Sequence, residues 1–252
     1  MHSKRMLPTI VTVAVVVAIH SGDVGGQVRP ASWTTRLTDH FEIYYRRQQN
    51  ERVIEEVAHE AEQAYSRVSF DLKYEMRKKV PLILVPSDRD LPRDEDSAGT
   101  IIRASGSPDG DHLLLSLESV ENRPTVLVHE LTHQFEFEMI PRSISLPEWV
   151  LEGLADHEAG AWTTADVLTV RDAATRDHIP SVASLVADRL WGHALLDFVA
   201  AEFGNQGIQQ YLTALRGSVA TDGSASRVAF GIAEDDFDWA FRRFIRSRFS
   251  DR

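Results

Sequence analysis

Cysteine is absent from this chain of 252 residues. Disulfide bonds and lipid attachment through cysteine are therefore excluded. If the protein is exported, it depends on its core and on any bound metal for stability. Internal repeats and low-complexity tracts are also lacking, which argues against solenoid and fibrous architectures. Apolar residues make up 43% and charged residues 26%, so the chain can bury a substantial core.

A concentrated block of basic residues is likewise missing. The chain has 27 Lys and Arg against 38 Asp and Glu, which gives a net charge of −11. No Lys/Arg-rich stretch stands apart from acidic neighbours. Nucleic acid is therefore not an expected partner.

The N-terminus has the pattern of an export signal. Lys4 and Arg5 precede an apolar run over 6–19, and small residues follow it. The run is shorter than the roughly 20 residues that a membrane span needs. We predict a signal peptide over 1–26, with its cleavage site left open, and a bacterial periplasmic or extracellular location. An uncleaved N-terminal membrane anchor is the alternative.

The most informative motif is His129-Glu130-Leu131-Thr132-His133. Asn122 and Pro124 are helix-start signals ahead of it, and Leu127, Leu131 and Phe135 form an apolar stripe on the opposite side. On a helix, histidines at i and i+4 leave the same face about one turn apart. The spacing therefore predicts that both imidazoles bind one metal ion.

A carboxylate ligand is expected from the segment that follows. Glu152 comes after a gap of 18 residues, in a predicted helix that begins near Pro147 and ends at Gly160. Two imidazoles and one carboxylate leave a fourth position for water, which is typical of catalytic zinc. We expect one Zn²⁺ per chain. Asp156 shares a face with Glu152 and is predicted to accept the free N–H of His129.

At these residues the chain resembles the gluzincin zinc metallopeptidases, and among them the peptidase MA-like domains. The shared features are the His-Glu-x-x-His motif, the 18-residue gap and Glu152-Gly153-Leu154-Ala155, with weaker likeness at 40–45, 191–194 and 202–204. The resemblance implies an α+β, zincin-like fold. A small mixed N-terminal sheet with a covering helix and the active-site helix (27–139) would precede a helical C-terminal lobe (140–252), within one domain over 27–252.

The chemistry implied is peptide hydrolysis by a water that zinc activates. Glu130 points about 100° away from His129 around the helix, so it is predicted to be the general base. Gluzincins usually take an oxyanion donor, Tyr or His, from the downstream lobe. Trp191 stands where a tyrosine is often found, so His193 and Tyr211 remain, and we favour His193. His112, His157 and Glu158 lie near the motifs but not at a helical spacing that directs them at the ion.

The expected partner is a peptide or protein substrate. A Gly-x-Met-Glu-Asn segment, which aminopeptidases of the related family carry ahead of the zinc helix, is not found, so we expect an endopeptidase. The alternative is a catalytically inactive zincin-fold module that binds or scaffolds in the cell envelope. Oligomeric state stays open.

Periodicity predicts the remaining elements of the sheet lobe. We expect an irregular lead-in over 28–39, a strand at 41–45, a covering helix over 50–68 and a strand at 80–85 that is buried or near an edge. A charged loop over 87–99 and paired strands at 100–102 and 112–117 follow. Residues 113–117 either pair with extended substrate, as a strand upstream of the zinc helix does in similar enzymes, or form an ordinary inner strand.

The helical lobe has a less regular pattern. We expect a loop with a short helix over 162–178, helices over 181–203 and 208–215 that end at Gly204 and Gly217, and a flexible connection over 219–226. A final amphipathic helix is predicted over 234–249.

Overall fold

Five strands form one mixed sheet among the residues that the structure describes. The structure is a computed structural model. It describes residues 33–91, 104–106, 112–118, 122–140, 146–160, 162–185, 187–218 and 224–249. All of these belong to one compact unit, Ser32–Arg252. The predicted signal peptide over 1–26 lies outside the described residues.

The strand order is β1-β2-β3-β5-β4. Strands β2 and β3 pair in parallel, as do β3 and β5, whereas β1 and β4 are antiparallel edge strands. The five strands have the following bounds: β1 Trp33–Leu37, β2 Phe41–Arg46, β3 Val80–Val85, β4 Ala104–Gly106 and β5 Leu113–Ser116. The α+β class with a small mixed sheet is therefore as predicted.

Strand β1 corrects the prediction of an irregular lead-in over 28–39. It pairs with β2 from Trp33 opposite Arg46 to Leu37 opposite Glu42. None of its residues is buried, so it has no alternating apolar face for a sequence pattern to reveal. By contrast β2 alternates buried and half-buried residues, which is why 41–45 was recognisable as a strand.

Strand β3 is central in the sheet even though it contains a proline. Pro81 pairs only with β2, opposite Glu42, because pairing with β5 begins at Leu82. Its missing N–H therefore costs no bond on the β5 side.

Strand β5 lies between β3 and β4, so both of its edges are already paired. Residues 113–117 therefore form an ordinary inner strand, and the alternative, that they pair with extended substrate, is wrong. Its hairpin partner is 104–106; residues 100–102, predicted for that role, lie outside the described residues.

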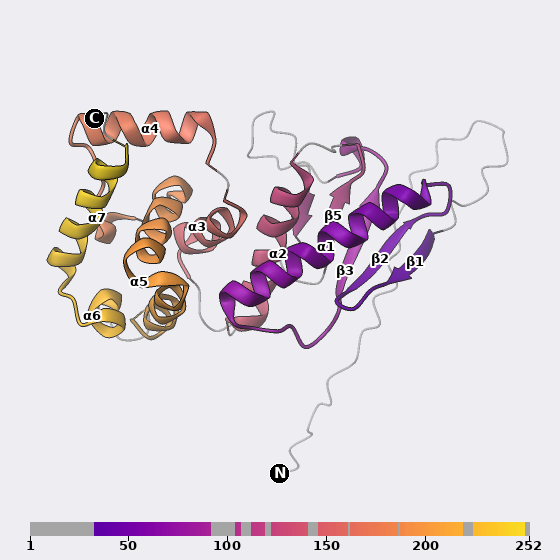
Figure 1. Cartoon of the computed structure of the whole chain (residues 1–252), viewed down its shortest axis with the longest axis horizontal. Coiled ribbons are helices and arrows are strands. Elements are labelled where there is room, and N and C mark those ends of the chain that lie inside the picture. Colours follow the sequence, from indigo (N-terminus) through magenta and orange to yellow (C-terminus); the bar gives the residue numbers. More distant parts are fainter. Residues whose placement is uncertain are drawn as a thin grey trace, which may run out of the picture. The chain divides into compact units, whose positions relative to one another are not determined.

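Two helices complete the sheet lobe: α1 (Glu51–Leu72), which crosses the sheet in Figure 1, and α2 (Arg123–Met139). Asn50 caps α1 by accepting from the N–H of Arg52. The predicted stripe of α2, Leu127, Leu131 and Phe135, is buried in the core. Near its start, buried Arg123 donates two hydrogen bonds to the carboxylate of Glu60 on α1. This bidentate pair fixes the beginning of the motif helix against the covering helix.

The remaining helices form the second half of the unit: α3 Glu148–Ala159, α4 Thr164–Thr175, α5 Arg189–Ser218, α6 Ala225–Phe230 and α7 Glu234–Phe249. Short 3₁₀ turns occur at Asp88–Asp90 and Val182–Ser184. The apolar face of α7 is buried as predicted, and Phe237 and Phe241 pack their rings on Phe198 of α5. None of the helices in the described part of the chain has the length and apolar character that a membrane crossing requires.

Three boundaries in this half differ from prediction. Residues 164–175 form a regular helix begun by a Thr163–Asp166 capping box. The helix predicted from residue 181 begins at Arg189, where the Asp188 side chain accepts from the N–H of Trp191. Residues 225 and 226, placed in a connection, open α6. Gly204 does interrupt α5, because its φ of 70° and ψ of 179° are not helical.

Candidate metal centre

Three of the predicted ligands meet at one point. The Nε2 atom of His129 lies 3.6 Å from Oε2 of Glu152, and Nε2 of His133 lies 3.5 Å from Oε1 of the same carboxylate. One ligand atom from each residue lies within 4.8 Å of the other two. Ligands bound at about 2.0–2.1 Å around a tetrahedral ion are about 3.3 Å apart, so the three side chains could hold a metal ion.

The local folds of two helices produce this arrangement. His129 and His133 stand one turn apart on α2, with ring centroids 5.0 Å apart and planes at 87°. The buried stripe on the other side of α2 directs both rings away from the core. Glu152 lies in the first half of α3, and all three ligands are half-buried, so the centre keeps some access to solvent.

Asp156, one turn after Glu152, holds the first histidine. Its Oδ1 is 3.1 Å from Nδ1 of His129, and its Oδ2 accepts from Arg189. Burial alone would raise the pKa of Asp156, but the hydrogen bond from His129 and the charge of Arg189 lower it below its usual value. An ionised Asp156 keeps the proton on Nδ1 and leaves Nε2 free to coordinate.

Glu136 plays the matching part for the second histidine and was not among the predicted residues. It follows His133 by three positions on α2, is buried, and places Oε2 2.8 Å from Nδ1 of His133. Burial alone would lower the pKa of His133, but Glu136 and the charges of Glu152 and Glu130 raise it to about 9. The i, i+3 spacing of His133 and Glu136 is the signal that could have revealed this contact.

Glu130, the predicted base, is half-buried on α2. Its negative charge is among the causes that raise the pKa of His133. It lies about 100° around the helix from His129. It can therefore face the open side of the centre without being one of the three ligands.

The two oxyanion candidates are both buried. His193 is 2% exposed and its Nε2 is 3.5 Å from Oδ1 of Asp197, in a second group with His157. Tyr211 is buried against the ring of Phe237, at 5.5 Å between centroids. The directions of the His193 and Tyr211 rings depend on how α5 packs against its neighbours, which cannot be predicted from spacing within one helix. Sequence reasoning also set His157 aside and did not consider Asp197.

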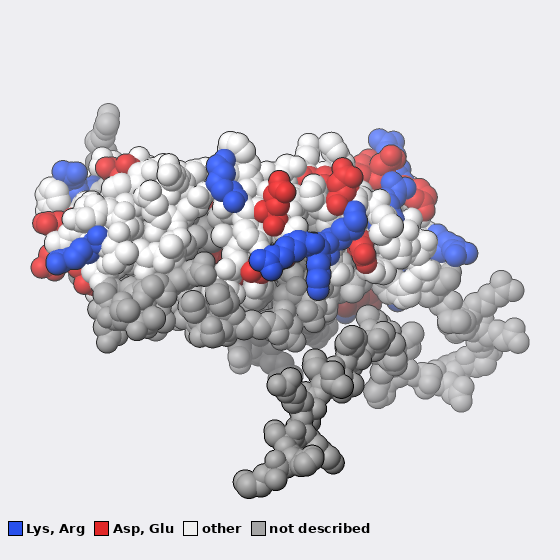
Figure 2. All heavy atoms as spheres, turned by 90° about the horizontal axis from the view of Figure 1, so that it is seen from below, with Lys and Arg blue, Asp and Glu red and all other residues white. Residues whose placement is uncertain are grey.

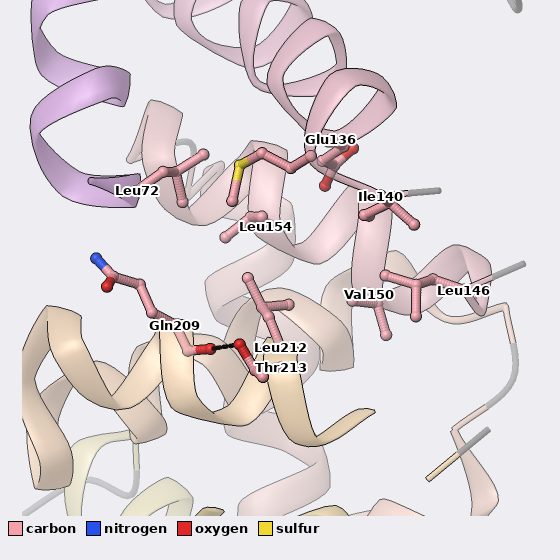
Figure 3. A pocket seen from close by; sticks show the side chains of 10 residues that line it. Leu72, Glu136, Ile140, Leu146, Val150, Leu154, Gln209, Leu212 and Thr213 are labelled. Atoms are coloured by element: carbon pink, nitrogen blue, oxygen red, sulfur yellow. Dashed lines mark hydrogen bonds between the residues drawn. The ribbon is translucent and has the colours of Figure 1, made fainter. Parts of the chain in front are cut away.

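An apolar pocket of about 180 Å³ adjoins the centre through Glu136 (Figure 3). Its walls come from α1, α2, α3 and α5 and include Leu72, Ile140, Val150 and Leu212. Neither histidine nor Glu152 lines it. The Oε1 atom of Glu136 is buried and has no hydrogen-bond partner, while Oε2 holds His133. The pocket therefore contacts the support of the centre and none of its ligands.

Charged side chains of both signs are present on one face of the molecule. On the face drawn in Figure 2, the described Lys and Arg side chains are interspersed with Asp and Glu. Among the described residues on that face, the mixed signs give no field of one sign that would steer a charged partner.

The sequence matches no protein-family model, and none of the curated proteins is similar enough to match it.

Proposed function

We propose that this protein is a zinc-dependent peptidase of gluzincin type with a zincin-like fold. One observation carries the proposal: the nitrogen atoms of His129 and His133 and the carboxylate of Glu152 converge at distances that suit a single metal ion. The two helices that hold them also supply a carboxylate behind each histidine, Asp156 and Glu136.

Zinc is the metal that this donor set favours. Imidazole nitrogens suit Zn²⁺ and other late first-row ions, whereas Ca²⁺ and Mg²⁺ prefer oxygen ligands alone. Three protein ligands leave one position of a tetrahedron for water, the arrangement of catalytic zinc and not of structural zinc. Bound zinc would acidify a water molecule and polarise the carbonyl of the scissile peptide bond.

The chain's own residues have separable parts in this reaction. Glu130 accepts the proton from the attacking water and delivers it to the departing amine. Asp156 and Glu136 fix the imidazoles of His129 and His133 with their Nε2 atoms directed at the ion. Peptide or protein is the substrate class, and endopeptidase action after export is part of the proposal.

A metal-binding module without turnover is the competing function. The position of His193 favours it, because the side chain expected to stabilise an oxyanion is buried in another cluster. The test is cleavage of a mixed peptide pool, read by mass spectrometry, before and after chelation and after zinc is restored. A peptidase cleaves internal bonds, loses activity on chelation and regains it with zinc. Bound zinc without cleavage of any peptide contradicts the proposal and supports the module.

A further inference from the structure

A second cluster of metal-ligating side chains lies between α3 and α5. His157 of α3 and His193 and Asp197 of α5 offer two nitrogens and one oxygen within 4.8 Å of one another. This donor set, two imidazoles and a carboxylate, has the same composition as the centre described above. The cluster is separate, because the two groups share no residue.

The two carboxylate oxygens of Asp197 contact different partners. Oδ2 accepts from the indole N–H of Trp162 at 3.0 Å and pairs with Arg248 at 3.2 Å. Oδ1 faces the histidines, 2.7 Å from Nδ1 of His157 and 3.5 Å from Nε2 of His193. A carboxylate held in this way through one oxygen is oriented to bind a metal through the other.

His193 supplies the second, independent observation. His193 is only 2% exposed, and its ring packs on the ring of Trp162 with 4.3 Å between centroids. Its Nε2 atom is buried and has no hydrogen-bond partner. A buried polar atom without a partner is costly, and a ligated cation removes that cost. A proton shared between His157 and Asp197 occupies the short contact of Oδ1, and Nε2 of His193 is left with only the longer, 3.5 Å approach to the same oxygen.

We propose that His157, His193 and Asp197 form a second binding site for a divalent first-row transition metal, with zinc as the physiological choice. The separation between Nε2 of His193 and Oδ1 is already close to the roughly 3.3 Å expected between ligands of a tetrahedral ion. When a metal binds, the distance between Nδ1 of His157 and Oδ1 of Asp197 widens from 2.7 Å to that value. The His157 side chain is 17% and the Asp197 side chain 12% exposed, so the cluster keeps limited access to solvent.

The role of this site is structural. His157 directly follows Asp156 on α3, the helix that also carries Glu152, and the other two ligands come from α5. A metal there joins the C-terminal half of α3 to α5 and so steadies the helix that supplies the third ligand of the first centre. The site stands whether or not the first centre is catalytic.

The test counts zinc by mass spectrometry in the untagged full chain at buffered free zinc. Wild-type protein is expected to hold two zinc ions, His157→Gln one, and His133→Gln one; the double variant should hold none. His59→Gln is the matched control, because His59 is exposed on α1 and outside both clusters, and it keeps two.

The two proposals fail in different ways. One zinc in wild type that persists in His157→Gln and is lost in His133→Gln overturns the second site and leaves the first. One zinc in wild type that is lost in His157→Gln and persists in His133→Gln overturns the first centre and supports the second site. No zinc in wild type overturns both. Anomalous diffraction at the zinc edge needs no substitution: a peak between His157 and His193 supports the site, and its absence from zinc-loaded crystals overturns it.

Discussion

Gly153 of α3 and Gly192 of α5 pack directly against each other. A methyl group at Gly153 would lie 2.5 Å from the carbonyl carbon of Gly192, and one at Gly192 would lie 2.0 Å from the carbonyl oxygen of Trp149. Backbone thus meets backbone where the two helices cross. Glu152 of the first centre precedes one glycine and His193 of the second cluster follows the other.

This contact predicts that Gly192→Ala weakens the fold and the first centre together. The added methyl must push α3 away from α5, and overpacking of this kind costs about 1–3 kcal/mol. Chemical denaturation should show a loss of stability in that range, and zinc affinity should fall because Glu152 moves with α3. Wild-type stability in Gly192→Ala would show that the helices do not cross this closely.

The pH dependence of zinc binding tests the pair formed by His133 and Glu136. Zinc needs the neutral imidazole, and the pKa of His133 is raised to about 9, so a proton competes with zinc throughout the neutral range. Competition with one proton makes zinc affinity rise about tenfold per pH unit up to that pKa. Isothermal titration with zinc across neutral pH measures this slope.

Glu136→Gln should flatten that slope, because the variant lacks the carboxylate that holds the proton on His133. The pKa of His133 then falls, and the rise in affinity should end at lower pH than in wild type. Glu138→Gln is the matched control on the same helix, since Glu138 bonds Tyr74 and not His133. Parallel curves for wild type and Glu136→Gln would refute the pairing.

Asp156→Asn should weaken zinc binding about 10- to 100-fold, the usual effect of removing a carboxylate behind a ligating histidine. The amide no longer holds the imidazole of His129 by charge. Arg189→Ala is the companion variant, because it removes the other partner of Asp156 from a side chain that is half exposed. We expect its effect on affinity to be much smaller. Equal losses would mean that the ion pair, and not the His129 contact, carries the role of Asp156.

The sequence predicted the features that depend on the geometry of a single helix. The spacing of His129 and His133, the apolar stripe of α2 and the start of α3 depend on one helix at a time, so they could be read from sequence. The choice of Glu152 as third ligand rested on the 18-residue gap and on its place in the next predicted helix, because spacing within one helix cannot show which residue of α3 meets α2.

Features that depend on neighbouring elements escaped prediction. His193 packs on Trp162 and lies beside Asp197, and His157 becomes a candidate ligand only because α5 lies beside α3. Strand β1 exists through pairing with β2 and buries none of its own residues. In each case a tertiary contact decides what the sequence pattern leaves open.

The most direct test of the proposed chemistry is Glu130→Gln, with zinc content and peptide cleavage measured on the same sample. Glu148→Gln, an exposed glutamate in the first turn of α3, is the control for the loss of one carboxylate. We expect Glu130→Gln to retain the zinc of the first centre and to lose cleavage by about 10²- to 10⁴-fold, the contribution typical of a general base. Cleavage at the wild-type rate with zinc in place would contradict the account.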